Sequence, residues 1–394
     1  MRTQKNNTPK IVTAYKKESA ARWYDNDLIK SLNCTLNLIV GGRNIGKSYD
    51  FISDAVIDYW TKNRTTAFLR RHKTNFSLIN TDNLYNDHES HDFISKVTGG
   101  EWTSVCYWQR GWYLCKYVGE DRKRVKDKKP FMYAIPVSTA EDIKSGFKDP
   151  MCYTIIFDEF LATADQYLPN EWMLFSTIIS TIQRTKPDEE FRIYLLGNSL
   201  NAHSLYFRNL GIKHFGRQEW GTIQVYEFAP SDDHPNGFKM AVELCSETGE
   251  ASKTSGGFFY AFDDPTARMT RGLSWEIEDY PLKKNEELQE ITKDNIIFTF
   301  FVEYDDETIQ CEIVEDPKGV YVFCHPRSAR YPIDRDNELI YTEELDIRAN
   351  IRDTFLDPRD KIDASIKRLY LLKHFRYSDN EVGDLMKNFL EQQK

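Results

Sequence analysis

The sequence predicts a parallel α/β domain followed by a smaller α/β domain. Three observations carry this prediction. Short apolar segments, of the kind that form buried strands, alternate with amphipathic helices over the first half of the chain. Three further strand-like segments, separated by short polar turns, follow near residue 300. Two amphipathic helices close the chain. Strands that alternate with helices are typical of a parallel sheet covered by helices.

The strand predictions in the first half rest on short apolar segments. Residues 36–40, 65–69, 153–157 and 191–196 are such segments, and continuous apolar character suits a strand that is buried on both faces. The spacing of apolar residues predicts helices over about 48–59 and 172–182. Between them, segments at 102–108, 112–118 and 131–137 predict an antiparallel set of strands.

The composition changes after about residue 228, where the turn-rich segment 231–237 begins. Segments 296–304, 308–314 and 319–324 then predict a β-meander, because short polar turns join them. Helices are expected over about 361–373 and after Ser378-Asp379, a suitable N-cap. We therefore expect a first domain over residues 1–230, a linker or hinge region over 231–290 and a C-terminal domain over 291–394.

Charge and cysteine usage exclude some classes of protein. The net charge of -9 is not that of a simple nucleic-acid binder, but Lys and Arg are frequent before about residue 130, so a local basic surface is compatible with it. The seven cysteines never fall as CxxC, which argues against a disulfide framework and a zinc site. The sequence has neither a secretory signal pattern nor an apolar run of the roughly 18 residues that a membrane span needs. A reducing cytosol is the expected compartment.

A phosphate-binding loop follows the first apolar segment. It reads Gly41-Gly42-Arg43-Asn44-Ile45-Gly46-Lys47-Ser48 and matches GxxxxGK[ST], the Walker A motif. Glycines allow the tight turn that points backbone amides at phosphate oxygens. Lys47 is expected on the β- and γ-phosphates of ATP, and Ser48 on Mg²⁺. Its place between a predicted strand and a predicted helix is the context that this motif requires.

A second apolar segment ends in two carboxylates, Asp158 and Glu159. This is a Walker B pattern, in which Asp158 is expected to hold Mg²⁺ and Glu159 to orient and polarise the attacking water. The second acid is typical of P-loop NTPases of the additional-strand, catalytic-glutamate class. The alternative is a solvated strand end, or caps for a following helix.

Further site residues are predicted with alternatives. Asn198 follows a strand expected beside the Walker B strand and is a candidate sensor of the γ-phosphate, or else part of a simple turn. Arg184 is a candidate arginine finger supplied to a neighbouring subunit, with Arg70 and Arg71 as rivals. Tyr24, next to Trp23, is a candidate to stack on adenine, with burial in the core as its alternative.

A dense group of cations lies between two of the predicted strands, at 121–129. These side chains would contact DNA phosphates without reading sequence. A solvated hairpin tip is the alternative. The candidate DNA contacts are Arg122, Lys123, Arg124, Lys126, Lys128 and Lys129.

Several of these segments, in this order and spacing, resemble the DNA-packaging ATPases of small tailed phages with protein-primed linear genomes, relatives of terminase large subunits. The resemblance is carried by residues 36–49 (LNLIVGGRNIGKSY), Ala134–Ser138, Lys144-Ser145, residues 154–160 (TIIFDEF) and Asn198-Ser199. The helical pattern from about 341 to 394 is also similar.

The resemblance implies a ring of subunits, a pentamer in such motors, at the portal or connector of an empty capsid in the host cytoplasm, with an RNA or protein adaptor as a further partner. Double-stranded DNA would be pushed inward as ATP is hydrolysed. The resemblance also implies a C-terminal domain with a ribonuclease-H-like fold. Glu303, Asp305 and Asp306 are the acids near its first strand, and no later helix offers partner carboxylates, so we expect a degenerate nuclease without two-metal cleavage.

Two other functions remain open from the sequence. The chain would also suit another DNA-dependent P-loop ATPase, such as a helicase, or a nucleotide-dependent chaperone. An assembly factor that binds ATP as a switch and scarcely hydrolyses it is the second alternative. Glu159 argues against the latter, because such a switch has no need of a residue that polarises water.

Overall fold

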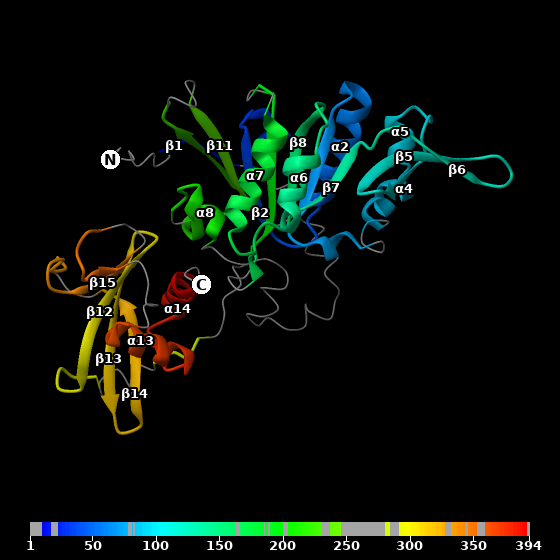
Figure 1. The fold of residues 1–394 in the computed structure, drawn as a ribbon. Helices are drawn as coiled ribbons and strands as arrows, with labels where there is room; N and C mark the ends of the chain where they lie inside the picture. The colour runs from blue at the N-terminus through cyan, green and yellow to red at the C-terminus, as the bar shows by residue number, and fades with distance from the viewer. Residues whose placement is uncertain are drawn as a thin grey trace. The chain divides into compact units, whose positions relative to one another are not determined.

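The computed structural model describes residues 10–16, 23–77, 81, 83–162, 166–184, 186–187, 190–199, 204–213, 215–230, 237–245, 280–283, 291–327, 332–342, 346–352 and 359–391. The chain divides into two compact units (Figure 1). The first is drawn from residues 1–200 and 218–275, and the second from 201–217 and 276–394.

The first unit is built on an eleven-stranded mixed sheet in the order β1-β10-β11-β2-β9-β8-β3-β7-β5-β4, with β6 paired to β5. The six strands from β11 to β7 in this order are parallel to one another. The strands are β1 (Lys10–Lys16), β2 (Leu36–Gly41), β3 (Thr65–Arg70), β4 (Ser104–Trp108), β5 (Gly111–Val118), β6 (Lys123–Lys126), β7 (Met132–Pro136), β8 (Cys152–Asp158), β9 (Arg192–Asn198), β10 (Thr222–Phe228) and β11 (Phe238–Leu244).

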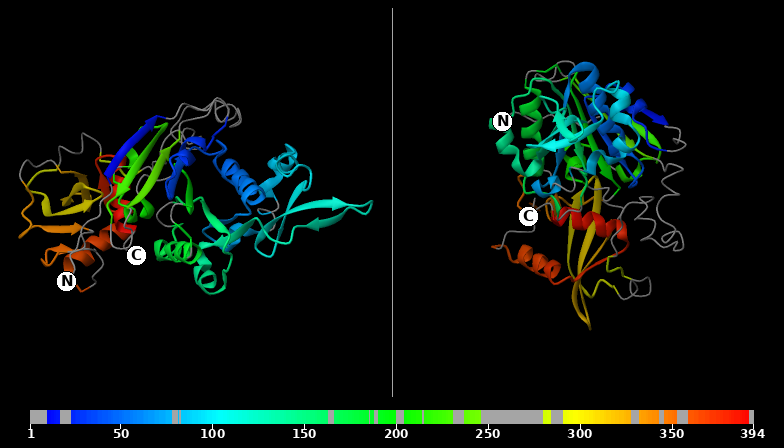
Figure 2. Two further views of the ribbon diagram at one scale, coloured as in Figure 1. Left: turned by 90° about the horizontal axis from the view of Figure 1, so that it is seen from above. Right: turned by 90° about the vertical axis from the view of Figure 1, so that its right-hand side faces the viewer.

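Helices cover both faces of this sheet (Figure 2). On one face, α2 (Lys47–Lys62) buries Phe51, Ile52 and Val56 against the sheet. On the other, α7 (Glu171–Gln183) lies beside α6 (Ala140–Gly146) and buries Phe175 and Ile178. Shorter helices of this unit are α1 (Asp27–Ser31), α4 (Asn86–Ser90), α5 (Phe93–Val97) and the 3-10 turns Lys73–Phe76, Asn83–Tyr85 and Val137–Thr139.

The order of the central strands confirms the predicted class of P-loop fold. The Walker A strand β2 and the Walker B strand β8 are not neighbours, because β9 lies between them and pairs with both in parallel. This inserted strand is the additional strand of the class. Because parallel strands end at one edge of a sheet, β2, β3, β8 and β9 bring their last residues together there.

Two predictions about strands need correction. The segment at 131–137 was expected to belong to an antiparallel set, but β7 pairs in parallel with β3 and only its first two residues pair antiparallel with β5. The predicted linker, 231–290, contains β11, which lies between β10 and β2 and is almost fully buried. The structure therefore places residues 238–244 in the first sheet.

The second unit contains a six-stranded sheet in the order β16-β15-β12-β13-β14-β17. The predicted meander is present, and β15 and β16 extend it in parallel beside β12. The strands are β12 (Ile296–Tyr304), β13 (Glu307–Asp316), β14 (Gly319–Pro326), β15 (Leu339–Thr342), β16 (Ile351–Arg352) and β17 (Phe375–Tyr377), and the helices are α8 (Leu205–Asn209), α13 (Lys361–Leu371) and α14 (Asn380–Glu391), with a 3-10 turn at Phe215–Arg217.

Local signals account for the elements of the second unit. Asp305 and Asp306 both have positive φ, the geometry of the tight two-residue turn that joins β12 to β13. At the start of α14, Asp379 Oδ1 accepts a hydrogen bond from the Val382 amide at 2.9 Å, as predicted for an N-cap. Within the described residues, no helix combines the length and the apolar character that crossing a membrane requires.

Candidate nucleotide-binding site

The Walker A loop and the ends of three other strands surround a cavity of about 570 Å³ in the first unit. Arg70 comes from the end of β3, Asp158 and Glu159 from the end of β8, and Asn198 from the end of β9. Residues 43–48 of the Walker A loop line the same cavity. The structure thus brings together groups that lie up to 155 residues apart in the sequence.

The Walker A loop has the backbone shape that its sequence predicts. Gly46 has a φ of 99°, which strongly favours glycine, and α2 begins at the next residue. Gly41 packs so closely on Cys245, the residue after β11, that an added Cβ would lie 2.6 Å from the Cβ of Cys245. The Lys47 ammonium is buried and donates to the carbonyl oxygens of Gly41 and Gly42 at 3.0 and 2.6 Å. Burial lowers the pKa of Lys47.

The two predicted magnesium ligands lie together. Ser48 Oγ, at the start of α2, donates a hydrogen bond of 2.8 Å to Asp158 Oδ1 at the end of β8. Asp158 is buried, and its other oxygen accepts a hydrogen bond of 2.6 Å from the Arg70 guanidinium. A hydroxyl beside a carboxylate is a donor set that fits Mg²⁺, which prefers oxygen ligands.

Glu159 points its carboxylate at the same cavity. Its side chain is 55% exposed, and Oε2 lies 3.8 Å from Arg70. Its backbone has a φ of 61°, which is uncommon for a residue with a side chain. The neighbouring arginine holds this backbone, because Arg71 donates to the carbonyl oxygens of Glu159 and Phe160 at 3.2 and 2.7 Å. Arg71 is itself fixed by a buried, two-pronged ion pair with Glu171 on α7.

Asn198 lies at the cavity, as a sensor would require, and its backbone is paired with that of Gly41 across β2 and β9.

The three arginines considered as fingers are placed differently. Arg70 and Arg71 are engaged with the carboxylates and carbonyls of their own chain. Arg184 caps the end of α7, is exposed and is not among the described residues that line the cavity. Of the three, only Arg184 has the accessibility that a finger supplied to another subunit needs.

Tyr24 is buried, which is the alternative that the sequence left open. Its hydroxyl donates to Glu243 Oε2 of β11 at 2.9 Å, and its amide to the Ile45 carbonyl at 2.8 Å. Its ring therefore supports the Walker A loop from the core and offers no face to a base. Trp23 is 45% exposed, and its side chain lies 3.7 Å from the position that a Cβ on Gly46 would take. Of the two aromatics, Trp23 is the one available for stacking.

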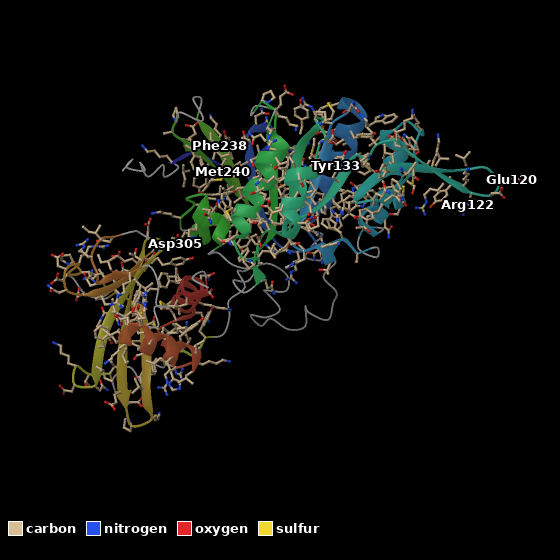
Figure 3. The ribbon with its side chains drawn as sticks, in the orientation of Figure 1. Glu120, Arg122, Tyr133, Phe238, Met240 and Asp305 are labelled. Atoms are coloured by element: carbon tan, nitrogen blue, oxygen red, sulfur yellow. The ribbon has the colours of Figure 1, made fainter. Side chains whose placement is uncertain are left out.

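The six candidate DNA-contact cations lie on and after a hairpin of β5 and β6. Lys123, Arg124 and Lys126 are on β6, Arg122 is in the turn before it, and Lys128 and Lys129 follow it. Figure 3 labels Glu120 and Arg122 at the tip of this hairpin, which extends beyond the helices of its own unit.

The sequence did not reveal the roles of Arg70, Arg71 and Glu171, although all three shape the site. The available signal was their position. Arg70 is the last residue of the strand that pairs with the Walker B strand and Arg71 follows it, so both were expected near Asp158 and Glu159. Glu171 offered no local signal, since its partner lies 100 residues earlier.

Curated proteins of two phages are similar to part of the chain. The DNA packaging protein of Bacillus phage B103 is 30% identical to the chain over 183 residues, which is 45% of this chain and 48% of that protein. The DNA packaging protein of Bacillus phage phi29 is 28% identical over 189 residues, 47% and 49% of the two chains. The chain is similar to phage DNA packaging proteins. It spans about half the length of the curated relatives that it matches. No protein-family model matches it.

Solved structures extend the similarity of fold to nearly the whole chain. The Phi-28 gp11 DNA packaging motor superimposes with a TM-score of 0.54 at 16% identity, over 95% of this chain and 99% of that one. The bacteriophage Phi-29 viral genome packaging motor assembly gives 0.53 at 17% identity, over 93% and 99%. At these identities the comparison shows the fold. Together with the curated relatives, it confirms the resemblance predicted from residues 36–49 and 154–160.

Proposed function

We infer that this chain is an ATP-driven motor that moves double-stranded viral DNA into a preformed capsid. The observation that carries the proposal is the hydrogen bond between the Walker A Ser48, in the first turn of α2, and the Walker B Asp158, at the end of β8, with Glu159 at the same cavity. This arrangement suits hydrolysis of ATP. The similarity to DNA packaging proteins supports the coupling of that hydrolysis to DNA packaging.

Each residue of the site has a defined part in the proposed hydrolysis. The amides of the Walker A loop and the Lys47 ammonium bind the phosphates and neutralise their charge. Ser48 and Asp158 would hold Mg²⁺, which neutralises charge that develops on the phosphate oxygens. Glu159 accepts a hydrogen bond from the attacking water and orients it toward the γ-phosphate. Asn198 is proposed to sense that phosphate, and Arg184 to reach the nucleotide of a neighbouring subunit.

The proposed partners are those of a packaging motor. They are double-stranded DNA, other copies of the chain in a ring of five, and the portal of the capsid with an RNA or protein adaptor, in the host cytoplasm. The six cations of the β5–β6 hairpin are the proposed contacts to DNA phosphates.

For the second unit we propose a ribonuclease-H-like fold without nuclease activity. Its mixed sheet, a meander with two parallel strands added at β12, supports this fold. Glu303 and Asp306 are engaged by cations, since Glu303 pairs with Arg335 at 2.7 Å and Asp306 pairs with Lys213. Among the residues that the structure describes, no group of three or more His, Cys, Asp or Glu side chains is arranged to hold a metal.

The experiment that tests the motor is ATP turnover by the purified chain, with and without linear double-stranded DNA, at low and moderate salt. We expect DNA to stimulate turnover and salt to weaken the stimulation, because phosphate contacts release counterions. Lys47→Ala should abolish turnover. Turnover that survives Lys47→Ala would refute the assignment of the phosphate site, and turnover indifferent to DNA would refute coupling to DNA in the isolated chain.

Two measurements separate the alternatives. A helicase separates the strands of short tailed duplexes, and a packaging motor should leave them paired. An assembly factor that merely binds ATP should turn over equally slowly with Glu159→Gln, whereas we expect that change to lower kcat at least about 100-fold, the usual size of a general-base effect.

A further inference from the structure

The antiparallel extension of the first sheet carries one face on which aromatic rings and cations are interleaved. We call it the ring–cation face, and define it as Trp108 of β4, Tyr113 and Tyr117 of β5, Arg124 and Lys126 of β6, and Arg122 of the turn. The register places these strand residues on one side, because side chains alternate along a strand and Tyr117 pairs with Arg124, Cys115 with Lys126 and Cys106 with Tyr113.

The cations of this face lie over its rings. Lys126 Nζ is 4.0 Å from the centre of the Tyr113 ring and 4.3 Å from that of Trp108. Arg124 and Arg122 lie 5.7 and 6.0 Å from the centre of the Tyr117 ring. These distances are those of cation–π contacts. Trp108 remains 47% exposed and Tyr117 50%, so both rings keep a surface open to a ligand.

The opposite face of the same strands is used differently. There Trp112 and Leu114 are buried in the main core of the unit, with Val105 and Tyr107 packed against it. Where these four residues lie, that face is covered by the core of the unit. On the ring–cation face, only Cys106, Tyr113 and Cys115 form a small buried cluster, and the surface toward the hairpin tip stays open. The tip extends beyond the helices of its unit in two perpendicular views (Figures 1 and 2).

We propose that the ring–cation face binds single-stranded nucleic acid, with unpaired bases stacked on Tyr117 and Trp108 and phosphates held by Arg122, Arg124 and Lys126. Surfaces that take single strands combine a basic track with rings on which successive bases stack. The chain as a whole has a net charge of -9, whereas the hairpin is basic. The hairpin is therefore a local surface whose charge is complementary to a polyanion.

The rings decide between single strands and the other polyanions. A duplex presents its phosphates outward and keeps its bases stacked inside. It would therefore contact the cations, and no base would stack on Tyr117 or Trp108. An acidic protein segment would likewise pair with the cations alone. Only unpaired bases use both halves of the face. The inference does not depend on the motor proposed above, since the hairpin residues are not among those lining the nucleotide cavity.

The test measures binding of labelled single-stranded and duplex oligonucleotides of equal length to the full chain. Tyr117→Ala should weaken single-strand binding roughly 5- to 150-fold, the range that corresponds to one stacked base, and leave duplex binding unchanged. Tyr117→Phe should restore it, because the ring and not the hydroxyl stacks. The matched control is Val118→Ala, since Val118 is 48% exposed on the same strand but points to the opposite face.

Salt titration separates the two kinds of contact. Tyr117→Ala should leave the salt dependence of single-strand binding unchanged, whereas Arg124→Gln should reduce its slope by about 0.7, the value for one phosphate contact on a single strand. DNA and RNA of the same sequence form two arms. Equal affinities for DNA and RNA would mean that the face contacts only the bases and phosphates, which both have. Tighter binding of RNA would mean that it also contacts the 2′-hydroxyl.

Three results would overturn the proposal. The first is an equal loss of duplex and single-strand binding in Tyr117→Ala, which would mean that the change damaged the hairpin. The second is a Tyr117→Ala chain, folded by its thermal unfolding curve, that binds single strands as well as the parent. The third is polyglutamate competing as effectively as a single strand, which would reduce the face to a general polyanion site. None of these results bears on ATP turnover.

Discussion

Arg70 lies beside both carboxylates of the site, those of Asp158 and Glu159. Its guanidinium lies 2.6 Å from Asp158 and 3.8 Å from Glu159, and its side chain is 22% exposed. A positive charge at this distance opposes the binding of a divalent cation to Asp158. We therefore predict that Arg70→Gln lowers the Mg²⁺ concentration needed for binding of a non-hydrolysable ATP analogue, by a factor of a few. Titrating Mg²⁺ at fixed analogue concentration measures this.

The matched control is Arg64→Gln, which removes the arginine directly before β3, where it pairs with Glu190. It should leave the Mg²⁺ requirement unchanged. If Arg70→Gln instead raises the requirement, Arg70 contacts the nucleotide itself, and its pairing with Asp158 is secondary.

Residues that act through local sequence could be predicted, and those that act through distant partners could not. Lys47 and Ser48 follow from the shape of one loop, and Asp158 and Glu159 from their place at a strand end. The support of Glu159 by Arg71 depends on the packing of α7 against the end of β3, which no spacing in the sequence reveals. Tyr24 was ambiguous for the same reason, because its partner Glu243 lies 219 residues later.

Helix α2 carries an acid that makes stability depend on pH. Asp50 lies in its first turn, where burial, followed by the charge of Asp54, raises the pKa of Asp50 to about 6. Between about pH 4 and pH 6, the folded chain keeps a proton that the unfolded chain has released. The contribution of Asp50 to stability is therefore present at low pH and is lost as pH rises through this window.

We predict that Asp50→Asn raises the free energy of unfolding relative to the parent chain, and that this gain is larger at pH 7 than at pH 4. The difference between the two pH values should be about 1–2 kcal/mol once solvent screening is allowed for. The amide oxygen can still accept the hydrogen bond that the Asn26 amide donates to Asp50 at 2.8 Å. Thermal unfolding across this pH range measures the difference. An Asp50→Asn curve parallel to the parent curve would contradict the shift.

Cys245, the residue after β11, makes a close contact with Gly41 at the end of the Walker A strand. Gly41→Ala would set two Cβ atoms 2.6 Å apart, a distance that real structures do not tolerate. We predict a loss of about 1–3 kcal/mol in the free energy of unfolding, the usual cost of overpacking a core. Cys245→Gly in the same chain should recover part of it, and a double-mutant cycle gives the coupling.

Gly146→Ala serves as the control for this cycle, because a Cβ at Gly146 meets nothing within 4 Å. It should leave stability unchanged or raise it slightly, since alanine restricts the unfolded chain. Additive effects of Gly41→Ala and Cys245→Gly would mean that these two residues are not in contact.

At the scale of the whole chain, the sequence predicted two α/β units but not their limits. The strands around residue 300 and the closing helices appear where their local patterns place them. β11 was assigned to a linker because turn-forming residues precede it and its sheet neighbour β2 lies about 200 residues earlier. Residues 201–217 were assigned to the first domain by their position in the chain, whereas their contacts place them in the second unit.

The place of β11 predicts where the first unit can be cut. A fragment of residues 1–230 lacks β11, so β10 and β1 lose their connection to β2 and the buried edge of β2 is left unpaired. The fragment also loses Met240, Val242 and Leu244, which are fully buried.

We predict that residues 1–245 fold cooperatively and bind nucleotide, whereas residues 1–230 do not. The matched control, residues 1–237, is seven residues longer than the failing fragment but still lacks the strand, and it should fail in the same way. Thermal unfolding with and without ATP distinguishes the three. Nucleotide binding by residues 1–230 with an unchanged unfolding midpoint would show that β11 is dispensable, and the first unit would then end where the composition of the sequence changes.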